Sequence, residues 1–288
     1  MNKASKLRQM LEGPGAVIAP GVYDALGARI VQDVGFQAVY MTGNGAMASL
    51  LGKPDLALAT MTEMVMRAHQ IAACVEIPLI CDADTGYGGL GNVRRTVEEF
   101  EAAGVAAIHI EDQVVQKRCG ALGGLKLVSE REACSRIEVA AAAKRNPDFT
   151  IIARTDAREV YGLNEAIRRV RLYREAGADM LMVEGLKSLE EIRRTVEETD
   201  APVLFNIYES SREEAYSVRD LEAAGVKLII NCLTSTLYNA ANMKRLFMDF
   251  KASGSTAAYV DKMMPMSEYT RILGIEEEAA LSEKQPSE

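Results

Sequence analysis

Short apolar runs alternate with amphipathic helical stretches along most of the chain. The apolar runs begin near residues 16, 37, 78, 106, 149, 179, 202 and 227, and polar residues do not alternate within them. Continuous apolar runs are typical of parallel strands that are covered on both faces. Eight such strands, separated by helices within about 235 residues, predict an α/β fold, a (β/α)8 TIM barrel.

A helix that ends in a glycine directly before a strand recurs four times. The segments are QDVGFQAVYM, EAAGVAAIHI, REAGADMLMV and EAAGVKLII, with glycines at Gly35, Gly104, Gly177 and Gly225. Glycine is favoured just past a helix end because it adopts the left-handed backbone at little steric cost. The repeats lie about two βα units apart, which favours the barrel. An open, doubly wound sheet is the alternative, but no GxGxxG motif follows the first strand.

Beyond the barrel, the chain has two further parts. We expect the barrel to span residues 1–252, with its last helix near 234–250, followed by a helical extension over 253–274. The barrel does not require this extension, so we expect its Met and Leu residues to pack on a neighbouring subunit, as an exchanged segment. Residues 275–288 are acidic and are expected to be a disordered tail.

The composition is that of a globular protein with a substantial core, with 48% hydrophobic and 26% charged residues. The net charge is −8, which argues against a nucleic-acid groove, because phosphate binding needs clustered positive charge. No apolar run approaches the roughly 20 residues that cross a membrane. The first residues also lack the apolar segment of a signal peptide. We therefore expect a cytoplasmic protein with a small-molecule ligand.

The five cysteines lack CxxC spacing, which argues against a disulfide framework or a zinc knuckle. Cys119 differs from the others because Lys117 and Arg118 precede it and Gly120 follows it. Neighbouring cations favour the thiolate, which makes this thiol a candidate proton donor and acceptor. It belongs to a glycine-containing loop over residues 113–127, a candidate lid. The other cysteines have apolar neighbours and are interpreted as small core residues: Cys74, Cys81, Cys134 and Cys232.

Several predicted strands end in carboxylates, at the edge where such barrels carry their active sites. The convergence of Asp82, Asp84, Glu111 and Glu184 requires a cation. Oxygen ligands without convergent His or Cys favour Mg²⁺, with Mn²⁺ possible. His109 is interpreted as a hydrogen-bonded wall residue. The other polar residues at these ends are Tyr40, Thr42, Gly43, Asn44, Arg154, Asp156, Asn206 and Asn231.

Two of these features suit an anionic ligand. Gly43 and Gly45 flank Asn44, and glycines at a strand end let backbone N–H groups approach an anion closely, although the segment also fits a simple tight turn. The planar guanidinium of Arg154 can grip a carboxylate in two places, or it can serve as a counter-ion for a neighbouring acid.

Five motifs carry a resemblance to a known family. They are MTGNGAMASLLGKPD, DADTGYGG, HIEDQ, KRCG and ARTDA, in this order. Over nearly its whole length the chain resembles the isocitrate lyase/phosphoenolpyruvate mutase superfamily. KRCG indicates the branch that contains 2-methylisocitrate lyase, 2,3-dimethylmalate lyase, oxaloacetate acetylhydrolase and carboxyphosphonoenolpyruvate phosphonomutase. The resemblance implies Mg²⁺-dependent chemistry through the enolate of a 2-oxo acid, and a homotetramer built as a dimer of dimers.

The resemblance also implies roles for individual residues. Asp82 would contact the metal directly, whereas three other acids would hold it largely through water: Asp84, Glu111 and Asp55. The substrate would be bound by Tyr40, Thr42, Gly43, Asn44, Asp82, Gly120, Arg154 and Asn206. Cys119 would be the acid of a gating loop. The full catalytic set would be Cys119, Lys117, Arg118, Arg154 and Glu184.

We therefore expect a Mg²⁺-dependent carbon–carbon lyase that cleaves a 2-hydroxy di- or tricarboxylate to pyruvate or another 2-oxo acid plus a carboxylate. The alternatives are an oxaloacetate acetylhydrolase, a phosphonomutase, and a barrel that binds a metabolite without catalysis. The family's lyases usually read KRCGH, whereas Ala121 follows Gly120 here. Asn44 also stands where many lyases have Gly. The absence of the His puts tricarboxylate substrates in doubt and is the one hint of a non-catalytic barrel.

Overall fold

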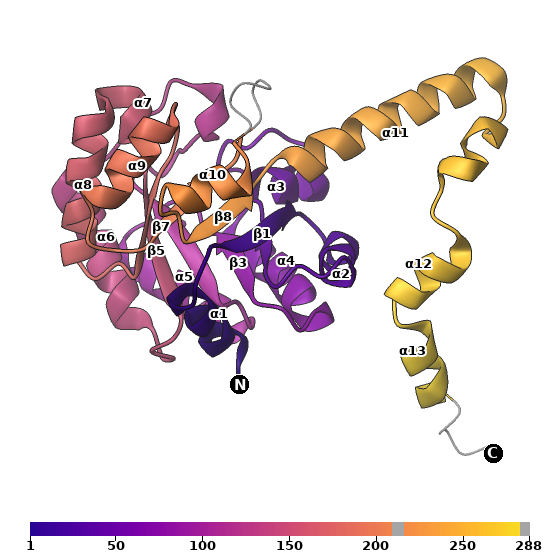
Figure 1. Cartoon of the computed structure of the whole chain (residues 1–288), viewed down its shortest axis with the longest axis horizontal. Coiled ribbons are helices and arrows are strands. Elements are labelled where there is room, and N and C mark those ends of the chain that lie inside the picture. Colours follow the sequence, from indigo (N-terminus) through magenta and orange to yellow (C-terminus); the bar gives the residue numbers. More distant parts are fainter. Residues whose placement is uncertain (209–215, 283–288) are drawn as a thin grey trace.

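The structure, a computed structural model, describes residues 1–208 and 216–282, without the side chains of Ala121 and Ser282. In the described residues, eight parallel strands close into a barrel in sequence order, which confirms the predicted fold (Figure 1). The barrel closes between its first and last strands, where Val17 lies opposite Leu228. The strands are β1 (Val17–Val22), β2 (Val39–Met41), β3 (Leu79–Asp82), β4 (Ala107–Glu111), β5 (Thr150–Thr155), β6 (Met180–Val183), β7 (Val203–Asn206) and β8 (Leu228–Asn231).

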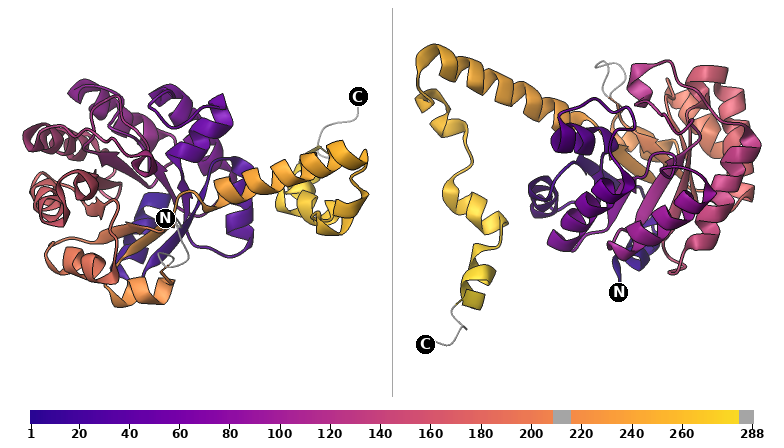
Figure 2. Two further views of the ribbon diagram at one scale, coloured as in Figure 1. Left: turned by 90° about the horizontal axis from the view of Figure 1, so that it is seen from above. Right: turned by 180° about the vertical axis from the view of Figure 1, so that it is seen from behind.

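Helices surround the barrel on its outside, as the views in Figure 2 show. The four glycines of the predicted repeat have φ angles of 98°, 87°, 106° and 89°, so each adopts the left-handed backbone expected after a helix. The outer helices are α2 (Ala25–Asp33), α3 (Gly43–Leu51), α4 (Met61–Cys74), α5 (Leu90–Ala102), α6 (Glu130–Ala143), α7 (Ala157–Tyr161), α8 (Leu163–Glu175), α9 (Leu189–Glu197) and α10 (Val218–Ala223).

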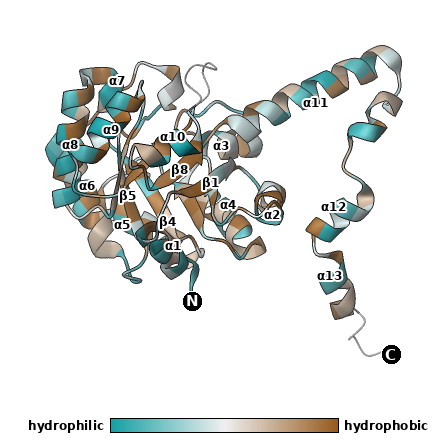
Figure 3. Cartoon of the chain, in the orientation of Figure 1, coloured by the Kyte–Doolittle hydropathy of each residue, from teal (hydrophilic) through white to brown (hydrophobic). Residues whose placement is uncertain are grey.

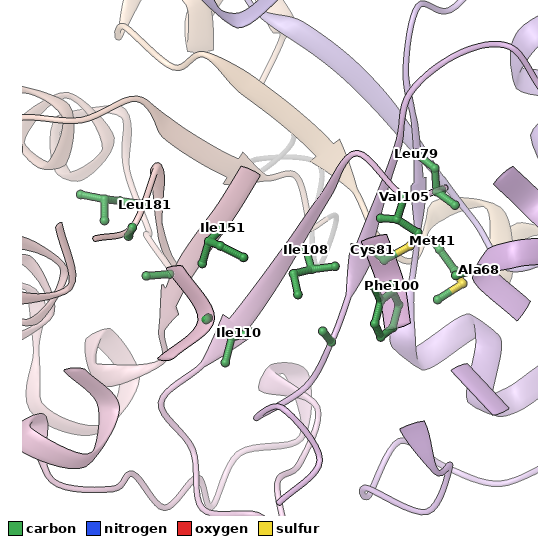
Figure 4. Close-up of a cluster of buried hydrophobic side chains, with 14 of the residues drawn as sticks. Met41, Ala68, Leu79, Cys81, Phe100, Val105, Ile108, Ile110, Ile151 and Leu181 are labelled. Atoms are coloured by element: carbon green, nitrogen blue, oxygen red, sulfur yellow. The ribbon is translucent and has the colours of Figure 1, made fainter. Parts of the chain in front are cut away.

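The core has two layers, and hydrophobic residues concentrate on the strands (Figure 3). The larger layer lies between the strands and the outer helices, where Phe100 of α5 packs with Cys81, Ile108 and other strand residues (Figure 4). The smaller layer fills the barrel interior. The end of the barrel at which the strands begin is covered by α1 (Lys3–Glu12), which contributes Leu7 and Leu11 to this layer. This closed end leaves the C-terminal ends of the strands as the accessible face of the barrel.

The chain leaves the barrel after β8. Helix α11 (Thr234–Ser253) has no buried residue and projects away from the barrel (Figures 1 and 2). The helix predicted near 234–250 is therefore present, but none of its residues is buried against its own barrel; the division at residue 252 stays a prediction. The remaining elements are the short 3-10 helix η3 (Ala257–Lys262), α12 (Met266–Ile272) and α13 (Ile275–Ser282).

Among the described residues, α12 contacts α2 of its own barrel. Arg271 of α12 forms two hydrogen bonds with Asp33 of α2, at 2.6 and 2.9 Å, and Ile272 is only 6% exposed. Within the tail predicted over residues 275–288, Ile275–Ser282 form α13, while residues 283–288 lie outside the described part. None of the described helices has the length and apolar character needed to cross a membrane.

Candidate active site

A cavity of about 520 Å³ lies at the C-terminal ends of the strands. Three further predicted residues lie outside the lining but contact residues that belong to it: Gly43 lies against Asp82, Asp84 against Lys117, and Glu111 against Arg154. Arg118, in contrast, is exposed and directs its guanidinium to the carbonyl of Gly123 at 3.4 Å, so the structure does not bring this residue into the cavity. The predicted site residues that line the cavity are Tyr40, Thr42, Asn44, Asp55, Asp82, Lys117, Cys119, Gly120, Arg154, Glu184 and Asn206.

Lys117 lies among the acids of the site. Its ammonium nitrogen is 2.8 Å from Asp55 Oδ1 and 2.7 Å from Asp84 Oδ1, and all three side chains are nearly inaccessible to solvent. Burial would lower the pKa of Lys117, but Asp84, Asp82, Glu111 and Asp55 raise it well above its usual value. Lys117 therefore stays charged and neutralises part of this cluster.

The carboxylates differ in their tendency to ionise. Burial opposes ionisation of Asp82, but His109, Lys117 and Arg154 outweigh it and lower its pKa to about 2. Because burial lowers the pKa of His109 to about 4, this ring is neutral at pH 7, and the lasting attraction comes from the two cations. Burial raises the pKa of Asp84 to about 6, with the nearby Asp82 and Asp55 adding to the effect. Burial also raises the pKa of Glu111.

These residues fit the predicted mode of metal binding. In the described part of the chain, no three His, Cys, Asp or Glu side chains are grouped closely enough to hold an ion directly. Asp82, whose pKa is lowered, lines the cavity together with Asp55, and Glu111 Oε1 is buried without a hydrogen-bond partner among the described residues. One direct ligand with other carboxylates reached through water is the arrangement that Mg²⁺ tolerates, because it gives up its waters reluctantly.

His109 connects Asp82 to the cavity wall. Its Nε2 lies 2.7 Å from the Tyr40 hydroxyl, and its Nδ1 lies 3.6 Å from Asp82 Oδ1. Since a carboxylate only accepts hydrogen bonds, the proton of the neutral ring belongs on Nδ1, and Tyr40 donates to Nε2. His109 is hydrogen-bonded beside the site, as interpreted, but it lies behind Tyr40 and Asp82 and is not itself part of the cavity lining.

Gly43 is required by the position of Asp82. A Cβ atom built on Gly43 would lie 2.2 Å from Asp82 Oδ2 and 2.8 Å from its Cγ, which is far inside van der Waals contact. The glycine of the TGNG motif therefore leaves the space that the Asp82 carboxylate occupies.

We expect Gly43→Ala to lower the free energy of unfolding by about 1–3 kcal/mol, as overpacking of a filled site does. It should also reduce turnover about 100-fold, because the Asp82 carboxylate must move by an ångström or more. Urea denaturation and steady-state kinetics measure the two effects. The control is Gly91→Ala, where nothing lies within 4 Å of the added Cβ; it should leave turnover unchanged. Equal behaviour of the two variants would show that the Gly43 contact does not matter.

The loop over residues 113–127, here called the gate loop, lies against the cavity. An antiparallel bridge between Gln113 and Leu127 closes its base, and the backbone N–H of Cys119 donates to the carbonyl of Asp55 at 3.1 Å. A Cβ on Gly120 would be 3.1 Å from Arg154 Nη2 and 3.3 Å from Glu184 Cγ. The gate loop is therefore closed over these side chains, and Cys119 belongs to the cavity lining.

Arg154 is held by carboxylates on two sides. Its Nη2 donates to Asp156 Oδ1 at 2.9 Å, and its Nη1 lies 3.5 Å from Glu111 Oε2. Its Nε is buried without a hydrogen-bond partner in the described residues. Arg154 thus presents a fixed guanidinium with unused donor capacity beside the cavity.

Glu184, Asn206 and Cys232 form a chain of contacts on the cavity wall. The Asn206 amide nitrogen lies 3.3 Å from Glu184 Oε1 and 3.2 Å from Cys232 Sγ, while its Oδ1 accepts from the backbone N–H of Cys232 at 3.2 Å. Burial raises the pKa of the Cys232 thiol to about 12, so it stays protonated. Cys232 packs against the inner core layer, as interpreted, and it also lines the cavity, which was not expected from the sequence.

Asp112 follows Glu111 but serves a different purpose. Its carboxylate accepts from Thr155 at 2.6 Å, from Tyr173 at 2.8 Å and from Arg169 at 3.0 Å. These contacts tie the end of β4 to α8 on the outside of the barrel. The side chain of Ala121, where the family's lyases usually have His, lies outside the described structure.

Comparisons with known proteins agree with this geometry. The sequence profile of a family described as phosphoenolpyruvate phosphomutase matches residues 7–249. A 2,3-dimethylmalate lyase of Eubacterium barkeri is 43% identical over 276 residues, which cover 96% of both chains. A 2-methylisocitrate lyase of Aeropyrum pernix is 39% identical over 268 residues, covering 93% of this chain and 86% of that protein.

Solved structures match over the whole barrel. An oxaloacetate acetylhydrolase in complex with the inhibitor 3,3-difluorooxalacetate has a TM-score of 0.93 at 37% identity, covering 98% of this chain and 96% of that one. A phosphonopyruvate hydrolase in complex with oxalate and Mg²⁺ has a TM-score of 0.88 at 28% identity and covers 99% of each chain. The motifs, the closed barrel and these matches show that the chain belongs to the PEP mutase/isocitrate lyase superfamily, as one of its lyases.

Proposed function

We propose that this lyase uses Mg²⁺ to cleave the C2–C3 bond of a 2-hydroxy dicarboxylate of the 2,3-dimethylmalate kind, and that it acts in the cytoplasm. The products are pyruvate, or another small 2-oxo acid, and a carboxylate. The observation that carries the proposal is that one cavity is lined by an ionised Asp82, by Arg154 and by Cys119 on a closed loop.

The two ends of the substrate meet different groups. Thr42 caps α3 and lines the cavity together with Asn44, so the first N–H groups of this helix and the positive end of its dipole favour the carboxylate of the 2-oxo acid. Arg154, whose Nε has no partner among the described residues, binds the carboxylate of the departing fragment.

Different residues serve metal binding, proton transfer and loop closure. Asp82 would hold Mg²⁺ directly, and Asp84, Glu111 and Asp55 would hold it largely through water; the ion would supply positive charge that lowers the pKa of the substrate hydroxyl. Glu184, whose Oε2 has no hydrogen-bond partner among the described residues and whose pKa is raised by burial, accepts the proton of the hydroxyl. The hydroxyl oxygen becomes the carbonyl of the 2-oxo acid, while the electrons of the C2–C3 bond move to C3. Cys119 gives its proton to C3, and the closed gate loop keeps water from competing. Lys117 holds the gate loop in place through its ion pairs with Asp55 and Asp84.

The cavity suits a dicarboxylate better than a tricarboxylate. The cations in its described lining are Lys117, Arg154 and Lys187, and Lys117 is already paired with two carboxylates. Lys187 is 58% exposed and pairs with Glu159 at 3.4 Å. A third substrate carboxylate would therefore lack a strong partner. Apolar residues such as Leu186 and Phe205 instead offer contacts to methyl groups.

The test is a screen of 2-hydroxy acids with Mg²⁺, detecting 2-oxo acids. We expect 2,3-dimethylmalate to yield pyruvate and propionate, with kcat/KM about 10-fold or more above those of 2-methylisocitrate and isocitrate. Acetate and oxalate released from oxaloacetate would instead identify a hydrolase, and phosphorus NMR of a phosphonate incubation would identify a mutase. A melting shift with oxalate and Mg²⁺, without turnover of any acid, would indicate a binding protein.

We also propose that the C-terminal extension is exchanged between subunits of a homotetramer, a dimer of dimers. Helix α11 buries none of its side chains and leaves Leu237 57%, Phe247 58% and Phe250 46% exposed. Apolar surface of this kind on a projecting helix is typical of a contact with another chain. A second copy is the occupant that fits, because its barrel is likewise left without a buried α11 of its own.

Phe247→Glu should weaken this assembly. Burying a phenylalanine contributes about 1.5–3 kcal/mol per copy, and a buried glutamate adds the cost of an unpaired charge. Sedimentation velocity should show dimers or monomers in place of the tetramer. Lys244→Glu places the same charge on an exposed position of the same helix and should leave the mass unchanged. A tetramer in both variants, or a monomeric parent protein, would contradict the exchange.

A further inference from the structure

Gln113 stands at the base of the gate loop and is 1% exposed. Its backbone is fixed from two sides. The carbonyl accepts from Arg136 Nη1 at 2.7 Å, and the residue forms the bridge with Leu127 that closes the loop. The backbone of Gln113 is therefore fixed, so whether its side-chain amide makes its contacts depends on the position of the gate loop.

Both ends of the Gln113 amide bind the backbone of the gate loop. Its Oε1 accepts from the N–H of Arg118 at 3.0 Å, and its Nε2 donates to the carbonyl of Arg118 at 2.9 Å. Arg118 lies between Lys117, which docks into the acid cluster, and Cys119. This pair of bonds can form only when the segment that carries Lys117 and Cys119 is folded back over the cavity.

The same amide reaches the guanidinium of Arg154 through one carboxylate. Gln113 Nε2 also donates to Asp156 Oδ2 at 3.2 Å, and the other oxygen, Asp156 Oδ1, accepts from Arg154 Nη2 at 2.9 Å. Asp156 is itself held by a bond from its N–H to Asp112 Oδ1 at 3.0 Å. Loop backbone, Gln113, Asp156 and Arg154 thus form one continuous hydrogen-bonded chain.

We propose that Gln113 is a positioning residue that couples closure of the gate loop to the orientation of Arg154. When the loop closes, the amide is fixed against Arg118, and it then holds Asp156 in the position in which Asp156 aligns the guanidinium. The inference rests on the proposed function only for the statement that Arg154 binds substrate. The coupling itself concerns the loop and the arginine, so it is measurable without turnover.

An amide is the group that this position requires. The carboxylate of a glutamate has the same shape and still accepts from the Arg118 N–H, but it cannot donate to the Arg118 carbonyl or to Asp156, and it repels both. Gln113→Glu should therefore release the gate loop and disturb Arg154. In Gln113→Glu with Asp156→Asn, the amide introduced at position 156 can donate to the carboxylate introduced at position 113, while its oxygen still accepts from Arg154. The second substitution should restore the link from position 113 to Arg154, although the bond to the Arg118 carbonyl stays lost.

The first readout is trypsin cleavage after Lys117, whose side chain is 2% exposed in the closed loop, mapped by mass spectrometry with and without Mg²⁺ and oxalate. We expect Gln113→Glu to be cleaved about 10- to 100-fold faster than the parent, the range for losing two buried hydrogen bonds. The double variant should recover part of this protection, because it regains the contact between positions 113 and 156 but not the bond to the Arg118 carbonyl. Gln116→Glu, an exposed position in the same loop, should behave as the parent.

The second readout is kinetic. With a substrate from the screen, kcat/KM of Gln113→Glu should fall about 10- to 100-fold, with a raised KM, and recover in the double variant. Loss of folding alone would not be rescued by Asp156→Asn. If Gln113→Glu does not fold, Gln113→Met removes the same bonds without adding charge and should give the same faster cleavage.

Unchanged trypsin protection in Gln113→Glu or Gln113→Met would overturn the proposal, and so would failure of Asp156→Asn to restore protection in the double variant. If no 2-hydroxy acid is turned over while the cleavage pattern behaves as expected, the proposed function fails and the coupling stands.

Discussion

Replacing Cys119 by serine is expected to slow turnover by about 10²- to 10⁴-fold, the usual contribution of a general acid. Serine preserves the size and position of the side chain, but its hydroxyl group is a far weaker acid than a thiol. Because the gate loop is docked through the Cys119 backbone N–H and through Lys117, the loop should still close. Oxalate and Mg²⁺ should therefore raise the melting temperature of the variant as much as that of the parent.

The matched control is Cys134→Ser, which changes a half-buried thiol on α6, outside the cavity lining. It should keep full activity. Turnover of Cys119→Ser equal to that of Cys134→Ser would remove Cys119 from the role of proton donor. Lost oxalate binding in Cys119→Ser would instead mean that the thiol holds the loop in place.

Asp82→Asn is expected to reduce turnover by about 10³-fold, because a bound metal contributes several kcal/mol of charge stabilisation. The amide oxygen can still accept from the Asp84 N–H, as Asp82 Oδ1 does at 3.0 Å, so the local backbone should keep its shape. What the variant loses is the negative charge that a divalent ion requires. The melting shift caused by Mg²⁺ should disappear, which is a readout independent of activity.

Asp200→Asn removes a carboxylate from an exposed position three residues before β7, at the opposite end of the barrel, and should retain both the Mg²⁺ shift and turnover. If Asp82→Asn keeps the Mg²⁺ shift, then Asp82 is not the direct ligand. If it keeps the shift but loses turnover, Asp82 acts on the substrate alone.

The strands and the face that carries the site were predictable because both follow from local patterns. Continuous apolar runs define the buried parallel strands, and the polar residues that end these runs must meet at one edge of the barrel. The direction of each side chain was harder to predict. Glu111 and Asp112 are adjacent, yet successive residues of a strand point to opposite faces, so Glu111 faces the barrel interior and Asp112 binds Arg169 and Tyr173 on the outside.

Contacts that depend on distant segments were not predictable from the sequence. Lys117 precedes Cys119 by two residues and was expected to act on the thiol, but its ammonium pairs with Asp55 and Asp84, because no sequence rule states where a loop folds back. Helix α11 has the length and apolar residues of a barrel helix, and its periodicity is the same whether its own barrel or another copy covers it.

Proton NMR of 2,3-dimethylmalate incubated with the protein in D₂O, with Mg²⁺ or with EDTA, tests the central claim most directly. With Mg²⁺ we predict equal amounts of pyruvate and propionate, the propionate carrying one deuterium next to its carboxylate, and no products with EDTA. Cleavage that continues unchanged in EDTA, or intact substrate alongside turnover of an unrelated class of compound, would contradict a metal-assisted lyase with a proton-donating loop.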